Sequence, residues 1–278
     1  MAPKPRVVKE QSEKKVLRPI ALTVAGFDPS SGAGVTADLK VFTNHGVYGV
    51  SAITALTVQS TLGVRRVQPV AAKLLRETLE CLADDLPIAG VKIGMLGSAE
   101  NVREVARFLR GAAIPRVRIV LDPVLASSSG AALLKPEGVR CLRDNLLPLV
   151  GWVTPNLAEL AILIGRPVAG RTQVPGAAQD LAALAALAPG IHVVVTGGHL
   201  NPPNDYLRTA DGHVTWFPGA RVKTASTHGT GCAFSSALLC RLLAGDAPAE
   251  AVAGAKAFVR QALLTAVPVG QGKGPVLS

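Results

Sequence analysis

The stretch with the clearest chemical potential is THGTGC, residues 227–232, whose cysteine opens an expected helix. Gly229 and Gly231 free the backbone to aim consecutive N–H groups at one point, and the helix start adds its positive end. Together these groups predict an anion hole for a phosphate or a developing negative charge. At this position Cys232 is expected to favour the thiolate, or to be a thiol that hydrogen-bonds near a phosphate. A purely structural turn is the alternative.

A second candidate is the glycine- and serine-rich stretch GFDPSSGAG, residues 26–34. It matches neither GxxxxGK[ST] nor GxGxxG, so it indicates a turn between a strand and a helix but no particular nucleotide motif. Asp28 in the turn and Asp38 on the following helix could accept hydrogen bonds from a polar ligand. Asp38 could equally be an ordinary exposed helix residue.

The pair Asn156 and Glu159 allows two readings on spacing alone. The pattern N-x-x-E at a helix start is that of a capping box. Alternatively, Glu159 could help to hold a magnesium ion, through water, beside nucleotide phosphates. Gln59, which follows a strand, could read a heterocycle with its amide. His228 beside the anion hole is as easily structural as catalytic.

Composition narrows the class of protein. Of the 278 residues, 49% are hydrophobic and only 4% are aromatic, so the core must consist mainly of Ala, Val, Leu and Ile. The formal net charge of +10 would suit an anionic substrate such as a nucleotide phosphate. Cys81, Cys141 and Cys240 fit no zinc pattern, and we expect them to be reduced thiols in the cytoplasm.

Residues 1–19 form an expected basic, mobile N-terminal tail, with six Lys or Arg against two Glu. No aromatic residue is interleaved with these charges, so a nucleic-acid partner is not expected. The tail has no apolar run of signal-peptide length, and no uncharged apolar stretch is long enough to span a membrane. We expect residues 20–278 to form one domain.

Short, solidly apolar runs alternate with longer helical patterns along this domain. This alternation predicts an α/β fold, a mostly parallel central sheet with helices on both faces. The expected strands cover 20–26, 47–56, 90–96, 118–125, 152–156 and 192–198, with a hairpin at 206–217. The expected helices cover 34–46, 74–86, 99–111, 138–150, 176–190, 231–244 and 248–266. In such sheets ligands bind beyond the carboxyl ends of the strands, where the unusual residues fall.

The motifs occur in one order over nearly the whole chain from about residue 20. They read ALTVAGFDPSSGAGVTADLK, SAITALTVQSTLGV, VKIGML, LDPV, TPNLAEL, TGGH and THGTGC. In this set the chain resembles the bacterial hydroxymethylpyrimidine/phosphomethylpyrimidine kinases of thiamine biosynthesis, in the ribokinase-like superfamily. The resemblance implies a single-domain ribokinase-like fold and two successive phosphoryl transfers from ATP with Mg2+. The substrates would be 4-amino-5-hydroxymethyl-2-methylpyrimidine and its monophosphate.

The resemblance also implies roles for individual residues. Pyrimidine contacts fall on Gly26, Asp38, Gln59, Met95 and Val124. The anion-hole turn falls on Gly229, Thr230, Gly231 and Cys232, where most ribokinase relatives carry an aspartate base at the last position. Asn156 and Glu159 fall in the Mg2+–phosphate network. The family is often dimeric, so a homodimer is expected, with the apolar strand at 47–56 as one possible contact.

Three positions depart from the family's pattern. Thr196 stands where a lysine is usual before the GGH motif. Ser128 stands at about the position of a lysine that is usual after the DPV motif. Two cations are therefore missing near the phosphates. Charge stabilisation is most of what such an enzyme provides. Lys223 and Arg221 are candidates for the substitute charge, and Phe27 replaces a small polar residue before the loop aspartate.

The sequence therefore predicts a cytoplasmic ATP-dependent pyrimidine kinase with Cys232 as base or as hydrogen-bonding positioner. Two alternatives stay open. One is a pyridoxal or pyridoxine kinase, although the Gln59 amide suits an aminopyrimidine edge better than a pyridine phenol. The other is a pyrimidine-binding protein with reduced or lost kinase activity, because the lysines are absent.

Overall fold

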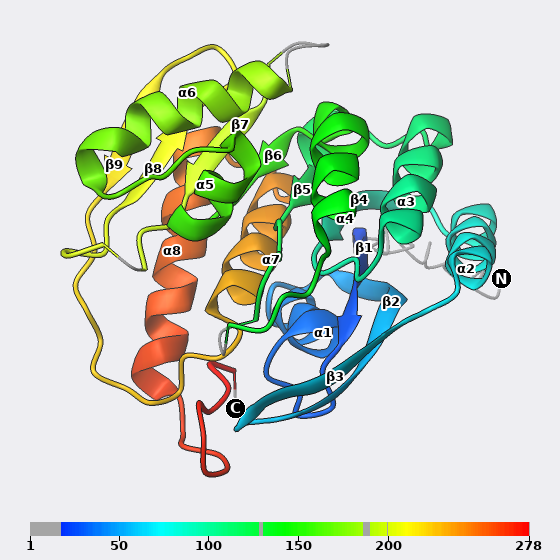
Figure 1. Cartoon of the computed structure of the whole chain (residues 1–278), viewed down its shortest axis with the longest axis horizontal. Helices are drawn as coiled ribbons and strands as arrows, with labels where there is room; N and C mark the ends of the chain where they lie inside the picture. The colour runs from blue at the N-terminus through cyan, green and yellow to red at the C-terminus, as the bar shows by residue number, and fades with distance from the viewer. Residues whose placement is uncertain (1–17, 128–129, 186–189, 199, 278) are drawn as a thin grey trace, which may run out of the picture.

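The computed structural model describes residues 18–127, 130–185, 190–198 and 200–277 (Figure 1). The expected tail, but for its last two residues, lies outside these ranges, as does Ser128. Within them the chain forms one mixed sheet of nine strands in the order β3-β2-β1-β4-β5-β6-β7-β8-β9. Among the described helices none has the length and apolar character needed to cross a membrane.

The apolar runs form the parallel centre of the sheet. Adjacent strands from β2 through β1, β4, β5 and β6 to β7 pair in parallel. These strands are β1 (Ile20–Phe27), β2 (Tyr48–Ser60), β4 (Ile88–Ile93), β5 (Ile119–Leu121), β6 (Trp152–Val153) and β7 (His192–Val195). Six residues in a row are buried in β1, as expected for a strand covered on both faces.

Antiparallel strands close the two ends of the sheet. At one end β3 (Gly63–Pro69) folds back on β2, and at the other β8 (Asp205–Arg208) and β9 (Val214–Phe217) form the expected hairpin. The strand β3 was not predicted from the sequence. Its run GVRRVQP carries two exposed arginines and little apolar character, which is typical of an exposed edge strand.

Helices cover both faces of the sheet (Figure 1). One layer and the adjoining face of the sheet share a buried apolar cluster that includes Phe42, Trp152 and Leu238. Its helices are α1 (Gly34–Asn44), α7 (Thr230–Leu243) and α8 (Pro248–Thr265). The other layer comprises α2 (Ala72–Asp85), α3 (Ala99–Gly111), α4 (Pro136–Cys141), α5 (Leu157–Ile164) and α6 (Val174–Leu184). The expected helix at 138–150 begins as α4 and continues as a π turn over Leu142–Leu146 and a 3-10 turn over Leu147–Leu149.

The strand order places a binding crevice at the centre of the molecule. The chain moves from β1 outward to β2 and β3, then returns to the other side of β1 with β4. At such a reversal the connections after neighbouring strands leave in opposite directions and open a crevice at the carboxyl ends. The turn after β1 and the start of α7 both lie at this edge, and α7 contacts β4 and β5.

Candidate active site

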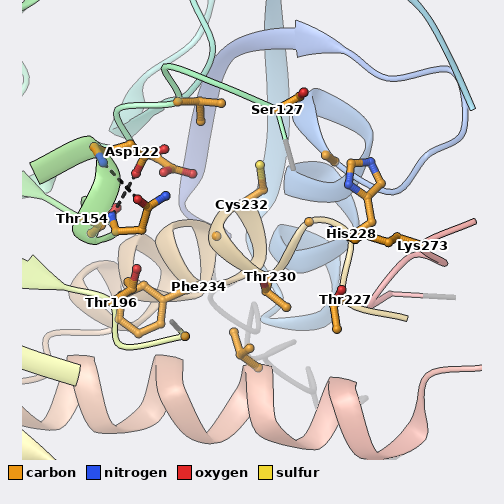
Figure 2. A pocket seen from close by; sticks show the side chains of 18 of the residues that line it. Asp122, Ser127, Thr154, Thr196, Thr227, His228, Thr230, Cys232, Phe234 and Lys273 are labelled. Carbon is orange, nitrogen blue, oxygen red and sulfur yellow. Dashed lines mark hydrogen bonds between the residues drawn. The ribbon is translucent and has the colours of Figure 1, made fainter. Parts of the chain in front are cut away.

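A large cavity opens along the carboxyl ends of the parallel strands (Figure 2). Its volume is about 1320 Å³, enough for two small ligands together. In Figure 2 Cys232 lies between Asp122 and Thr154 on one side and His228 on the other, with α8 running below them.

Most of the residues expected from the sequence line this cavity. They come from seven separate segments that only the fold brings together. They are Gly26, Asp28, Gln59, Met95, Val124, Asn156, Glu159, Thr196, Gly229, Thr230, Gly231 and Cys232. Met95 also packs with Ala55 and Leu133 in a small apolar cluster, against which Val124 is placed. This cluster gives one end of the cavity an apolar wall.

The start of α7 has the geometry of an anion hole. Gly229, the N-cap residue, has φ of 84° and ψ of 11°, and no side chain caps the helix. The first intrahelical bond is donated by Ala233 N to Gly229 O at 2.8 Å, so the N–H groups before it have no partner within the helix. A Cβ on Gly229 would lie 1.9 Å from Gly32 O, so this loop can approach the β1–α1 turn only because residue 229 is glycine.

The surroundings of Cys232 disfavour its thiolate form. Burial raises the pKa of Cys232 to about 12, with the charge of Lys92 acting against the shift and that of Asp38 adding to it. A hydrogen bond from the backbone of Gly34 favours the thiolate but is the weaker effect. The loss of solvation therefore outweighs the helix start, and of the two expected forms of Cys232 it favours the hydrogen-bonding thiol.

A buried charge cluster forms part of the cavity wall. Lys92 Nζ donates to Asp38 Oδ2 at 2.9 Å and lies 3.9 Å from Asp122 Oδ2. Asp38 also accepts hydrogen bonds from Thr23 Oγ1 and Ser236 Oγ, at 2.6 and 2.7 Å. Burial opposes the charge of Lys92, but the attraction of Asp38 raises the pKa of Lys92 above its usual value.

This cluster changes the expected role of Asp38. The side chain is fully buried and all its described hydrogen bonds are internal, so it does not line the cavity as a ligand contact would. The alternative of an ordinary exposed helix residue is wrong, because Asp38 is buried, whereas its contact with a pyrimidine stays a prediction. In this structure Asp38 pairs with Lys92, whose charge also acts on Cys232.

Asp122 and Glu159 form the acidic side of the cavity. Burial raises the pKa of Asp122, and burial together with the nearby charge of Asp122 raises the pKa of Glu159 to about 8. Asp122 also approaches the anion hole, because a Cβ on Gly231 would lie 3.9 Å from its Oδ2. Two buried carboxylates that repel each other fit a divalent cation with oxygen ligands. Among the described residues no group of three or more His, Cys, Asp or Glu has metal-site geometry. A cation here would therefore take its remaining ligands from water and phosphate.

Asn156 and Glu159 form the capping box that their spacing allowed. Asn156 Oδ1 accepts from Ala158 N and Glu159 N at 2.9 and 3.0 Å, and Glu159 Oε2 accepts from Asn156 N at 2.9 Å. Both residues also line the cavity, so capping and ligand binding are compatible here. The box fixes the Glu159 carboxylate in place at the start of α5.

The cations around the cavity differ from those expected. Arg221 and Lys223 are both exposed, but only Arg221 is among the lining residues, and it donates to Leu200 O at 3.0 Å. Lys256 on α8 also lines it and pairs with Asp205 at 2.7 Å. Thr196 is in the wall, and its backbone N donates to Pro155 O at 2.9 Å.

Sequence reasoning missed four polar residues of this region. They are Lys92, Asp122, Thr154 and Lys256. A lysine inside the apolar run VKIGML was a signal, because a fully buried lysine needs a partner. Asp122 directly follows β5, the position at which strand ends present functional groups. Lys256 lies in a helix with no motif, and only the packing of α8 against the cavity reveals it.

The nearby solved structures share this architecture. A pyridoxal kinase of Bacillus subtilis, solved as an ADP complex, superposes with a TM-score of 0.82 at 31% identity, covering 93% of this chain and 96% of that one. A phosphomethylpyrimidine kinase of Clostridium difficile 630 gives 0.76 at 33% identity, covering 88% and 100%. Together with the uncapped helix start and the buried carboxylates, these similarities place this chain in the class of ribokinase-like small-molecule kinases.

The sequence comparisons define the family. The chain belongs to the phosphomethylpyrimidine kinase family, whose model matches residues 28–277. The hydroxymethylpyrimidine/phosphomethylpyrimidine kinase of Rhizobium meliloti (strain 1021) is 42% identical over 261 residues, 92% of this chain and 96% of that protein. That of Haemophilus influenzae is 41% identical over 259 residues, 91% and 94% of the two chains. The resemblance drawn from the motifs is confirmed, as are the fold and the assignment to the phosphotransferases.

Proposed function

We propose that this protein transfers phosphoryl groups from ATP to 4-amino-5-hydroxymethyl-2-methylpyrimidine and then to its monophosphate. The observation that carries the proposal is the arrangement around Cys232. The uncapped start of α7, the Gln59 amide and the acidic pair Asp122–Glu159 all face one cavity. These are the parts needed to hold a phosphoryl group, a heterocycle and a divalent cation.

The chain's own residues act mainly by position and charge. Backbone N–H groups at residues 229–232 would hold the charge that develops on the transferring phosphoryl. Cys232, as a neutral thiol, would hydrogen-bond to the substrate hydroxyl and align it for attack. A loose phosphoryl-transfer transition state places little demand on a base, so a thiol with a pKa of about 12 is adequate in this position.

ATP and Mg2+ are the proposed cofactors. Pyridoxal kinase from Staphylococcus aureus, 29% identical with a TM-score of 0.83, was solved with ADP, which supports ATP use by this fold. Asp122 and Glu159 would hold Mg2+, partly through water. The bound ion would neutralise phosphate charge. Arg221 and Lys256 are the proposed substitutes for the cation that is absent at Thr196.

Pyridoxal phosphorylation is the second candidate, favoured by the likeness to pyridoxal kinases. Measuring ADP release with the hydroxymethylpyrimidine and with pyridoxal, at equal Mg-ATP, separates the two. We expect the higher kcat/KM with the pyrimidine. A higher value with pyridoxal would favour the second candidate, and binding of the pyrimidine without ADP release would favour a protein that has lost catalysis.

We also propose that two copies associate through β2. Four apolar side chains of the β2–β3 hairpin are at least half exposed: Tyr48, Leu56, Val58 and Leu62. Their burial against a second copy would remove apolar surface from water. Sedimentation velocity should give a dimer for the native chain and a larger monomer fraction for Leu56→Glu. A native monomer at micromolar concentration would contradict this.

A further inference from the structure

Three residues from different elements meet at one side of the cavity. His228 Nε2 lies 2.7 Å from Asp28 Oδ2 and 3.0 Å from Gln59 Nε2. Asp28 belongs to the β1–α1 turn, Gln59 to β2 and His228 to the loop before α7. All three line the cavity. Gln59 is the residue expected to read the substrate ring, so what holds its amide bears on specificity.

His228 itself has little freedom to move. Its backbone N donates to Gly274 O at 3.0 Å, and its O accepts from Val276 N at 2.9 Å. Its ring lies against Gly32, where an added Cβ would be 2.3 Å from the ring's Cδ2. The backbone bonds fix the residue, the contact with Gly32 limits the ring, and Nε2 points at Asp28.

The proton on Nε2 follows from the partners of Asp28. Its carboxylate already accepts from Ser30 N, Ser30 Oγ and Ala33 N, at 2.8, 2.7 and 3.0 Å. Burial tends to raise the pKa of Asp28, but the hydrogen bonds from His228 and Ser30 lower it below the usual value. An ionised carboxylate only accepts, so His228 Nε2 must carry the proton and donate it.

This proton decides which end of the Gln59 amide faces His228. As placed, Gln59 Nε2 faces the ring, so two donors would meet. Exchanging the oxygen and nitrogen of the amide by a flip removes this conflict. On the other side, Thr57 Oγ1 lies 2.9 Å from Phe27 O and 3.3 Å from the amide, and its single proton goes to the nearer Phe27 O. We therefore assign the flipped amide, in which Oε1 shares the single N–H of His228 Nε2 with Asp28 Oδ2 and the amide N–H points toward Thr57 Oγ1.

We propose that His228, oriented by Asp28, is a positioning residue that fixes the Gln59 amide and so selects an aminopyrimidine edge. One lone pair of Oε1 and one N–H of Gln59 are satisfied internally, which leaves one acceptor and one donor for the cavity. A ring nitrogen beside an exocyclic amino group offers the complementary acceptor and donor. A pyridine phenol does not offer this pair. The inference rests on the proposed function, because it names how that substrate is chosen.

The test compares two substrates, the 4-amino-5-hydroxymethylpyrimidine and its analogue without the 4-amino group. The readout is the ratio of their kcat/KM values, together with KM for ATP. In His228→Phe, which keeps a ring but removes the donor, we expect the ratio to fall roughly tenfold. His228→Gln restores a side-chain N–H donor and should recover part of the ratio. A merely structural role would lower both kcat/KM values equally and leave the ratio unchanged.

A double-substitution cycle completes the test. Gln59→Ala should lose the discrimination by itself, and adding His228→Phe to it should change the ratio no further. An unchanged ratio in His228→Phe, or a further fall in the double variant, would overturn the inference. If the native protein phosphorylates neither pyrimidine, the proposed function fails instead, so the two failures are distinguishable. Circular dichroism of each variant confirms that it is folded.

Discussion

The ammonium of Lys92 lies 2.9 Å from Asp38 Oδ2, and both side chains are completely buried. Removing one member of such a pair leaves an unpaired charge, so we expect Lys92→Met to cost about 3–5 kcal/mol in the free energy of unfolding. Asp38→Asn should cost a comparable amount. Urea denaturation measures both. The exposed pair Lys73–Glu77 is the control, and Glu77→Gln should change stability by less than about 0.5 kcal/mol. Equal effects at the two pairs would show that Lys92 is not desolvated.

Position 229 requires glycine for two reasons, its positive φ and its close approach to Gly32 O. In Gly229→Ala the φ of 84° would be strained, and the added Cβ would lie 1.9 Å from Gly32 O. Gly245→Ala is the matched control, because its φ is 92° and nothing lies within 4 Å of its added Cβ. We expect the control to cost about 1–2 kcal/mol by thermal unfolding. Gly229→Ala should cost more and also reduce kcat strongly, and equal costs would contradict the close approach.

The neutral thiol of Cys232 predicts a distinctive pattern of reactivity. Cys81 is exposed, whereas burial raises the pKa of Cys232 to about 12. At pH 8 iodoacetamide should therefore modify Cys81 well before Cys232, as peptide mass spectrometry can measure. Cys232→Ala should lower kcat far more than ATP affinity, and Cys232→Ser should retain more activity because a hydroxyl also hydrogen-bonds. Rapid alkylation of Cys232 would contradict the neutral thiol, and an unchanged kcat in Cys232→Ala would remove its catalytic role.

The raised pKa of Glu159 predicts a pH-dependent cost in stability. The ionised form is disfavoured in the folded protein, so stability falls as the pH rises from about 4.5 toward about 8. Glu159→Gln keeps an acceptor for Asn156 N and removes the charge. With chelator present, its Tm relative to the native protein should therefore increase over this pH range. A constant difference in Tm between pH 5 and pH 8.5 would contradict the shift.

Much of this fold could be predicted from the sequence, because the local patterns of apolar and capping residues agreed with the final packing. The strand at 20–26 and the helix at 99–111 were predicted with little error, since one is solidly apolar and the other has serine as its N-cap and a regular apolar face. The edge strand β3 was missed because its residues face solvent and carry charge. The role of Asp38 could not be predicted either, because its partners Thr23, Lys92 and Ser236 come from three other elements.

The anion-hole motif was found from the sequence, but its electrostatics were not. A glycine-rich turn before a helix signals exposed N–H groups, and local chemistry is enough to recognise it. The pKa of Cys232 depends on how deeply the fold buries the thiol and on charges from distant segments. Likewise, the capping-box and cavity roles of Glu159 proved compatible only once α5 was placed beside Asp122.

Arg221 and Lys223 provide a matched test of the substitute charge. Both residues are exposed, but Arg221 lines the cavity and Lys223, two residues later, does not. Arg221→Gln should raise KM for Mg-ATP by up to about tenfold, the effect of losing one charge-assisted hydrogen bond. Lys223→Gln should change it little. Steady-state kinetics at fixed free Mg2+ measure both, and a larger effect at Lys223 would contradict this placement.

The most direct test of the central claim is mass spectrometry of the products formed from 4-amino-5-hydroxymethyl-2-methylpyrimidine and Mg-ATP. We predict that the monophosphate appears first, that the diphosphate follows, and that ADP forms in step with both. The reaction should require Mg2+ and should be strongly reduced in Cys232→Ala. A native, folded protein that forms neither phosphate, or that phosphorylates only pyridoxal under the same conditions, would contradict the account.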